Sequence, residues 1–181
     1  MLRKENTVLL VIDIQDVLMP ENEKVSRNYL KQCSRLIRVM QALEVPILVT
    51  EQYPDRLGAT NEELLSLLGD TPRQPKIEFS CLANTAFREA LEKTGRKQLL
   101  IIGMETHICV MQTALEALDE GYEVYVVRDA VVSTREREYK AGLERLARGG
   151  AEITTTEMSI FELLRQGGTP EFKKVLPLIK E

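Results

Sequence analysis

The 181-residue chain has few of the residues on which many enzyme sites depend. It contains one histidine, His107, no tryptophan and only 5% aromatic residues. A single histidine excludes any metal site within the chain that needs two, such as a His-x-x-x-His pair or a two-histidine-one-carboxylate triad. It also leaves His107 as the sole candidate for catalysis by an imidazole. We therefore expect no metal ion and no other cofactor.

Cysteine is scarce as well, and its placement indicates a compartment. The three cysteines, Cys33, Cys81 and Cys109, form no C-x-x-C pair. An odd, unpaired set is not a disulfide framework and is typical of a reducing compartment. The apolar run at 8–12 is too short for a signal-peptide core, and no run approaches the roughly 18 residues needed to span a bilayer. We expect a cytoplasmic protein with no membrane partner.

Neither sign of charge dominates the sequence. The net charge is −4, with 29% charged and 44% hydrophobic residues. This balance argues against a disordered acidic chain and against a basic surface for nucleic acid. The arginines and lysines of 135–148 alternate with glutamates, a pattern typical of a solvated helix face. The length suits one domain, 1–181, with a substantial core and no nucleic-acid partner.

Apolar, β-branched runs alternate with helical patterns along the whole chain. Strands are predicted at 7–13, 46–50, 98–102, 122–127 and 151–154. Helices are predicted at 26–43, 61–68, 83–93, 106–120, 135–147, 158–165 and 169–180, and loops at 51–59 and 69–75. Such alternation predicts an α/β fold with a parallel sheet. Ligands bind such sheets outside the carboxyl ends of the strands, near a topological switch point.

Two residues at predicted strand ends are candidates for chemistry. Asp13 ends the first strand, where it either faces the ligand crevice or serves as a turn or cap residue. Cys109 lies in the first turn of the 106–120 helix, for which Thr106 is a plausible N-cap. A helix N-terminus stabilises a thiolate, so we expect the thiol pKa to fall. The apolar stripe leaves Cys109 on another face, although a small buried thiol remains the alternative; the stripe consists of Ile108, Met111, Leu115 and Leu118.

The remaining candidates have plainer explanations when taken alone. Cys33 lies on the apolar stripe of the first long helix and is expected in the core. Cys81 follows a strand-like run and could line a pocket. His107 lies about 200° around a helix from Cys109, so it is expected to cap the helix or line a pocket rather than act as a base. Lys76, as a lone lysine, would ordinarily be a solvated charge.

Three segments resemble the signature segments of the isochorismatase-like cysteine hydrolases, a superfamily that includes nicotinamidases and N-carbamoylsarcosine amidases. They are Val-Ile-Asp-Ile-Gln at 11–15, Pro-Lys-Ile-Glu-Phe-Ser at 75–80 and Gly-Met-Glu-Thr-His-Ile-Cys-Val at 103–110. The resemblance runs from about 7 to about 155 and is strongest to the isochorismatase-domain-containing subgroup. It implies a three-layer α-β-α sandwich around a mostly parallel sheet of about six strands with Rossmann-like topology.

The resemblance also implies site residues. Cys109 corresponds to the nucleophile, Asp13 to the general base and Lys76 to its electrostatic partner. A cis peptide bond is implied between Met104 and Glu105, which would aim the Glu105 and Cys109 N–H groups as an oxyanion hole. Substrate contacts are expected from Gln15, Gln52, Tyr53, Phe79 and Thr106.

Two departures from the superfamily narrow the expected function. Nicotinamidases bind a metal with an aspartate and two histidines near the second strand, and residues 51–55 here contain no histidine. Cys109 is retained, which favours amide chemistry over vinyl-ether hydrolysis. The leading hypothesis is a metal-independent cysteine hydrolase cleaving a C–N bond, amide or carbamoyl, of a small molecule. The alternatives are a vinyl-ether hydrolase of the isochorismatase type and a non-catalytic binding or redox module. The resemblance further implies a homo-oligomer.

Overall fold

A computed structural model describes residues 1–180, and its centre is one six-stranded sheet in the order β3-β2-β1-β4-β5-β6. All neighbouring strands are parallel. The strands are β1 (Thr7–Ile12), β2 (Ile47–Gln52), β3 (Arg73–Lys76), β4 (Gln98–Gly103), β5 (Glu123–Val131) and β6 (Glu152–Thr154). This order is that of a Rossmann-type sheet, and its direction of winding reverses between β1 and β4.

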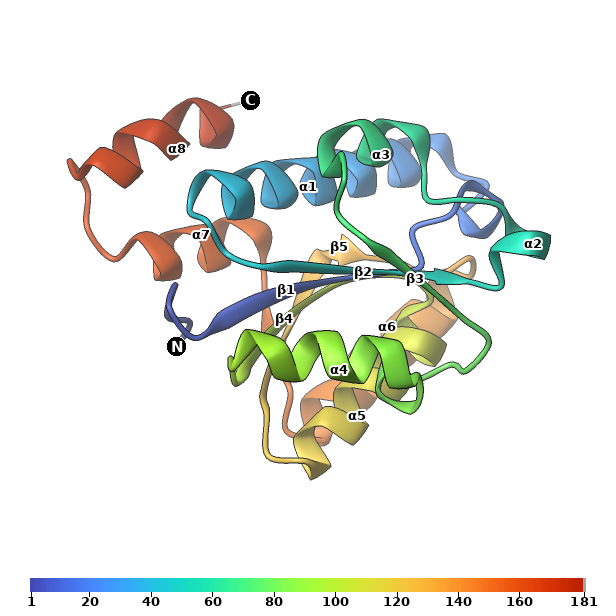
Figure 1. Ribbon diagram of the computed structural model, residues 1–181. Coiled ribbons are helices and arrows are strands. Elements are labelled where there is room, and N and C mark those ends of the chain that lie inside the picture. Colours follow the sequence, from blue (N-terminus) through green and yellow to red (C-terminus); the bar gives the residue numbers. More distant parts are fainter. Residues whose placement is uncertain (181) are drawn as a thin grey trace.

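Helices cover both faces of the sheet (Figure 1). On one face lie α1 (Glu23–Ala42), α3 (Glu62–Leu68), α7 (Thr156–Leu164) and α8 (Pro170–Lys180). On the other lie α4 (Thr85–Thr94), α5 (Met111–Asp119) and α6 (Glu136–Arg148). The three-layer sandwich with a parallel, Rossmann-like sheet is therefore confirmed. No helix within the described part of the chain is long and apolar enough to cross a membrane.

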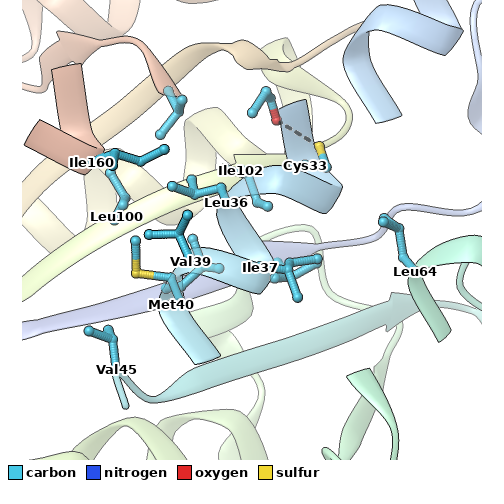
Figure 2. Packing of buried hydrophobic residues seen from close by; sticks show 14 of the residues in the cluster. Cys33, Leu36, Ile37, Val39, Met40, Val45, Leu64, Leu100, Ile102 and Ile160 are labelled. Carbon is cyan, nitrogen blue, oxygen red and sulfur yellow. Dashed lines mark hydrogen bonds between the residues drawn. The ribbon is translucent and has the colours of Figure 1, made fainter. Parts of the chain in front are cut away.

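The core consists of two apolar layers separated by the sheet. Side chains of β1 alternate between them: Leu9 and Val11 join the layer under α1, whereas Val8 and Leu10 join the layer under α4 and α5. This alternation follows from the two-residue period of a strand. Figure 2 shows the α1 layer, in which the buried Cys33 thiol lies 3.6 Å from the Ala130 carbonyl oxygen. The prediction that Cys33 belongs to the core is confirmed.

Two segments predicted as loops contain regular structure. Residues 73–76 form β3 at the edge of the sheet, and the first three of them belong to the predicted loop 69–75. The sequence Arg-Gln-Pro-Lys has no apolar alternation, and its proline is tolerated because an edge strand leaves one side unpaired. The predicted loop 51–59 contains the end of β2 and the short helix α2 (Pro54–Leu57). At β3, pairing with β2 and not a local pattern decides the structure, whereas α2 is a single turn that begins with a proline.

The segment predicted as one helix over 106–120 is divided. A π-helical turn, η3 (Thr106–Val110), precedes α5. Such turns are rare and often occur at functional sites. The N-cap is Glu105, so the expected N-cap role of Thr106 is wrong. The Thr106 hydroxyl is buried and has no hydrogen-bond partner among residues 1–180.

The buried face of this helical segment also differs from the predicted stripe. Small residues, Thr113, Ala114 and Ala117, are fully buried, and Cys109 is 5% exposed. The four residues of the predicted stripe are only partly buried. Small side chains let the helix approach the sheet closely, while the longer ones spread to its flanks. The expectation that Cys109 lies off the packed face is therefore wrong.

Candidate active site

The site forms at the switch point, where β1 and β4 end side by side. Asp13 follows β1 with a φ of 52°, a left-handed conformation that non-glycine residues rarely adopt outside functional or tight-turn positions. Gly103 ends β4 with a φ of 133°, and a Cβ there would lie 2.1 Å from the Ile12 carbonyl oxygen. The Met104 N–H donates to that same oxygen at 2.9 Å. Only glycine permits this approach, which brings Asp13 next to the segment that carries Cys109.

Asp13 and Lys76 form an ion pair inside the protein. Lys76 Nζ lies 2.6 Å from Asp13 Oδ2, and both side chains are fully buried. The other carboxylate oxygen, Oδ1, accepts a hydrogen bond from the Thr50 hydroxyl at 2.7 Å. Asp13 is thus held on both oxygens by neighbouring strands, since Thr50 lies in β2 and Lys76 ends β3.

The Lys76 ammonium is surrounded by acceptors. Besides Asp13, it donates to Gln52 Oε1 at 2.5 Å and to the carbonyl oxygens of Glu78 and Phe79 at 3.1 and 3.3 Å. Burial has the largest single effect and acts to lower the pKa of Lys76, but the charge and hydrogen bond of Asp13, together with the nearby Cys81 and Cys109, raise that pKa above its usual value. Lys76 is therefore a permanent cation fixed beside Asp13, not the solvated charge that the isolated sequence position suggests.

The Cys109 thiol adjoins this pair. Its Sγ lies 3.8 Å from Gln52 Oε1, the oxygen that also binds Lys76. Burial, followed by the charge of Asp13, raises the pKa of Cys109 to about 12, although the Lys76 ammonium acts in the opposite direction. The expected fall of the thiol pKa is therefore wrong for the free protein: loss of water and the nearby carboxylate outweigh the helix N-terminus. The resting group is a thiol, and its proton must be removed by a neighbour.

Cys81 lies behind the same carboxylate. Its thiol is fully buried and lies 3.8 Å from the Thr50 hydroxyl, which in turn contacts Asp13. Burial raises the pKa of Cys81 to about 11. Its backbone N–H donates to the Thr113 hydroxyl at 2.9 Å, which ties the segment to α5. Cys81 therefore packs against the site and is less exposed to solvent than Cys109.

Two predicted substrate contacts, Gln15 and Gln52, are engaged with the protein itself. Gln15 is fully buried; its amide donates to the carbonyls of Gln52 and Gly58 at 2.9 and 2.6 Å and accepts from the Gln52 N–H at 2.8 Å. These bonds occupy its side chain, so Gln15 orients β2 and the loop after it and is not available to a substrate. Gln52 connects Lys76 with Cys109 and donates to the Ile77 carbonyl at 3.0 Å.

The other predicted contacts fall into two groups. Tyr53 and Phe79 are 45% and 53% exposed, and Tyr53 lines a 440 Å³ cavity at the edge of the sheet together with Lys76, Ile77 and Glu78. Tyr53 follows Gln52 and Phe79 follows Glu78, and each of these preceding residues accepts a hydrogen bond from Lys76. Thr106 instead is buried beneath it.

The Met104–Glu105 peptide bond is cis, the conformation that the family resemblance implies. No acceptor for the Glu105 N–H lies among the residues that the structure describes. That group is therefore a candidate donor to a ligand oxygen. His107 does not contact Cys109; its Nδ1 lies 3.0 Å from the Ser133 hydroxyl and 3.5 Å from Glu105.

Sequence reasoning found the candidate nucleophile, base and cation. It missed two residues that hydrogen-bond to side chains of the site. Thr50, which binds Asp13, is visible in the sequence only as the polar end of an apolar run. Thr134, which binds the Glu105 side chain, lies in a loop with no motif. Within residues 1–180, no three histidine, cysteine, aspartate or glutamate side chains cluster closely enough to hold a metal ion.

Comparison with known families assigns the chain to one of them. The model of the isochorismatase domain matches residues 7–158. The chain belongs to the isochorismatase domain family. A similar protein in Phytophthora sojae, the secreted isochorismatase effector Isc1, is 38% identical over 180 residues, which cover 97% of this chain and 85% of the relative.

Solved structures of similar proteins share the fold. The MAR1 ribonuclease of Caenorhabditis elegans superposes with a TM-score of 0.91 at 32% identity, covering 99% of this chain and 92% of that one. The Escherichia coli YcaC protein, described as an octameric hydrolase of unknown specificity, gives a TM-score of 0.87 at 26% identity, covering 98% and 88%. This chain is therefore an isochorismatase-family protein with an isochorismatase-like hydrolase fold.

Proposed function

We propose that this chain is a metal-independent cysteine hydrolase that cleaves an amide or carbamoyl C–N bond of a small molecule. The observation that carries the proposal is the buried contact between Lys76 and Asp13 beside the Cys109 thiol. A thiol with a raised pKa is a poor nucleophile unless a base removes its proton as it attacks. Asp13 is the carboxylate next to that thiol, and Lys76 keeps it in place.

The steps follow from these roles. Asp13 accepts the Cys109 proton as the sulfur attacks the substrate carbonyl carbon, and the carbonyl electrons move to its oxygen. The N–H groups of Glu105 and Cys109 bind that oxyanion. When the C=O bond re-forms, the C–N bond breaks and Asp13 returns the proton to the leaving amine. A water molecule, deprotonated by Asp13, then attacks the thioester, which releases the acid and restores the thiol.

Several residues would assist without reacting. Lys76 orients the Asp13 side chain through their 2.6 Å contact, and Gln52 holds the ammonium close to the sulfur. Tyr53 and Phe79, exposed beside the opening, offer apolar contacts to the substrate. Thr106 supplies a buried hydroxyl that still lacks a partner within residues 1–180.

The vinyl-ether alternative receives less support from the charges of the site. An isochorismate-like acid carries carboxylates, which cationic hydrogen-bond donors recognise best. The Lys76 ammonium already contacts four acceptors and has no free hydrogen for a substrate carboxylate. A neutral amide needs only the oxyanion donors. The third hypothesis, a non-catalytic binding or redox module, predicts no turnover of any amide or carbamoyl compound.

A Cys109→Ala variant tests the proposal. We expect it to lose turnover of small amides and carbamoyl compounds, and we expect wild type incubated with an active substrate to acquire an acyl mass on the Cys109 peptide. The matched control is Cys81→Ala, which removes a buried thiol of the same site but leaves the nucleophile. Turnover that survives in Cys109→Ala, or isochorismate cleavage that depends on Asp13 and not on Cys109, would contradict the proposal.

Assembly and compartment are part of the same proposal. We expect a homo-oligomer, as YcaC is described as octameric, and light scattering tests this against the 20.6 kDa of one chain. We expect a cytoplasmic address, although the Phytophthora relative is named a secreted effector. We expect no nucleic-acid partner; release of nucleotides from RNA that depends on Cys109 would overturn that expectation and favour the activity named for the nematode protein.

A further inference from the structure

The side chain of Glu105 makes contacts that the triad chemistry does not require. Its carboxylate accepts hydrogen bonds from the Thr134 N–H at 3.0 and 3.2 Å and from the Thr134 hydroxyl. The His107 ring approaches the same carboxylate at 3.5 Å. Glu105 is only 8% exposed, so these contacts replace most of the water that a carboxylate would otherwise bind.

The backbone of the two segments is joined as well. The Thr106 N–H donates to the Val132 carbonyl at 3.0 Å, and the Val132 N–H donates to the Gly103 carbonyl at 3.2 Å. The loop after β5 is thus attached to residues 103–106 at three points, the third being the contact between the Glu105 carboxylate and Thr134. Glu105 lies between the other two attachments, and its own N–H is the group without an acceptor.

These contacts do not form a second nucleophile of the serine type. A serine–histidine–carboxylate relay uses the two different ring nitrogens of histidine, one for each partner. Here the same nitrogen, His107 Nδ1, meets both the Ser133 hydroxyl and Glu105. The cluster therefore cannot act as a proton relay. Its contacts instead hold the loop 132–134 against the segment that carries Glu105.

We propose that the Glu105 carboxylate is a positioning residue that clamps residues 132–134 onto the nucleophile segment and so holds the Glu105 N–H in place as an oxyanion donor. The inference rests on the proposed acyl chemistry at Cys109. Its physical basis is that an oxyanion donor helps only when it is fixed before the charge develops. A side chain anchored on the neighbouring loop fixes the backbone to which it is attached.

The test compares two reactions of the same thiol. Acylation by p-nitrophenyl acetate passes through an oxyanion, whereas alkylation by iodoacetamide does not. In Glu105→Gln, one acceptor oxygen is lost and an N–H₂ group faces the donors of Thr134. We expect the Cys109-dependent acylation burst to slow about tenfold or more, the order of an impaired oxyanion donor, with the alkylation rate unchanged within about twofold.

A second variant removes a donor of the same contact, on Thr134. Thr134 is exposed, so Thr134→Val removes the hydroxyl with little risk to folding, and we expect a smaller slowing of acylation, again without a change in alkylation. The matched control is Asp129→Asn, since Asp129 accepts from the N–H and hydroxyl of Thr156 in the same manner. This variant should lose stability and leave the ratio of the two rates unchanged.

The outcomes separate this inference from the function on which it rests. If wild type shows no burst beyond that of Cys109→Ala, the proposed function and the clamp both fail. If wild type acylates and Glu105→Gln does so at the full rate, the clamp alone is wrong. An equal loss of acylation and alkylation would show general damage to the site and would also overturn the clamp.

Discussion

Lys76 and Asp13 are 63 residues apart in the sequence, yet Nζ and Oδ2 lie 2.6 Å apart with neither side chain exposed to water. A buried ion pair is costly to form, and removing one partner leaves the other as an unpaired buried charge. Much of the stability of this region should therefore depend on keeping the pair intact or removing it whole.

Replacing Lys76 with methionine should destabilise the protein by about 3–5 kcal/mol, because the buried Asp13 carboxyl group would lose its charged partner. The double variant Asp13→Asn/Lys76→Met should recover much of that loss, since no net charge is then buried. Urea unfolding followed by circular dichroism measures both. Equal stability of the single and double variants would show that the pair is not electrostatically coupled.

The resting protonation of Cys109 can be read from its alkylation. Because its pKa is raised to about 12, the iodoacetamide rate on the Cys109 peptide should continue to rise from pH 8 to pH 10. A free thiol would approach a plateau above about 8.5. The same shift affects the stability of the protein. Because the pKa of Cys109 is higher in the folded than in the unfolded state, its contribution to the free energy of unfolding is present below the unfolded-state pKa and is lost as the pH rises toward 12. A plateau near pH 8.5 would contradict the raised pKa.

Replacing Asp13 should have opposite effects on the fraction of Cys109 present as thiolate and on the catalytic rate. In Asp13→Asn, the second-largest cause of the raised Cys109 pKa disappears, while the Lys76 cation stays close. The thiol pKa should fall, and alkylation at pH 8 should become faster by about tenfold for each unit of that fall. Acylation of Cys109 and amide turnover should nevertheless decrease, because no group remains to receive and return the proton. Faster turnover in this variant would remove Asp13 from the role of base.

Gly103 should not tolerate even a methyl group. Gly103→Ala would place a carbon 2.1 Å from the Ile12 carbonyl oxygen at a φ of 133°, so β1 and β4 would have to separate. We expect a loss of several kcal/mol or failure to fold. Gly167→Ala is the matched control, because no atom lies within 4 Å of its Cβ position. Thermal unfolding of the two variants checks the difference, and similar melting temperatures would exclude close strand approach as the reason for glycine.

The alternation of apolar runs and helical stripes was sufficient to predict the fold class, since buried parallel strands give continuous apolar runs and helices give a period of 3.6 residues. It failed at β3, where Arg73–Lys76 pairs with β2 without any apolar pattern. It also failed for α5, where the small residues Ala114 and Ala117, not the larger ones, face the sheet. In both places close packing with a distant segment outweighs local preference.

The sequence by itself determined the strand–helix order apart from β3, the placing of Asp13 after β1 and of Cys109 in the helical segment after β4, and the absence of a second histidine. Only the tertiary structure decided that Lys76 meets Asp13, that Gln15 turns inward and that Thr134 reaches Glu105. It also decided the direction of the Cys109 pKa. The reason is the same in each case: burial and charge act through space, between residues that no local pattern relates.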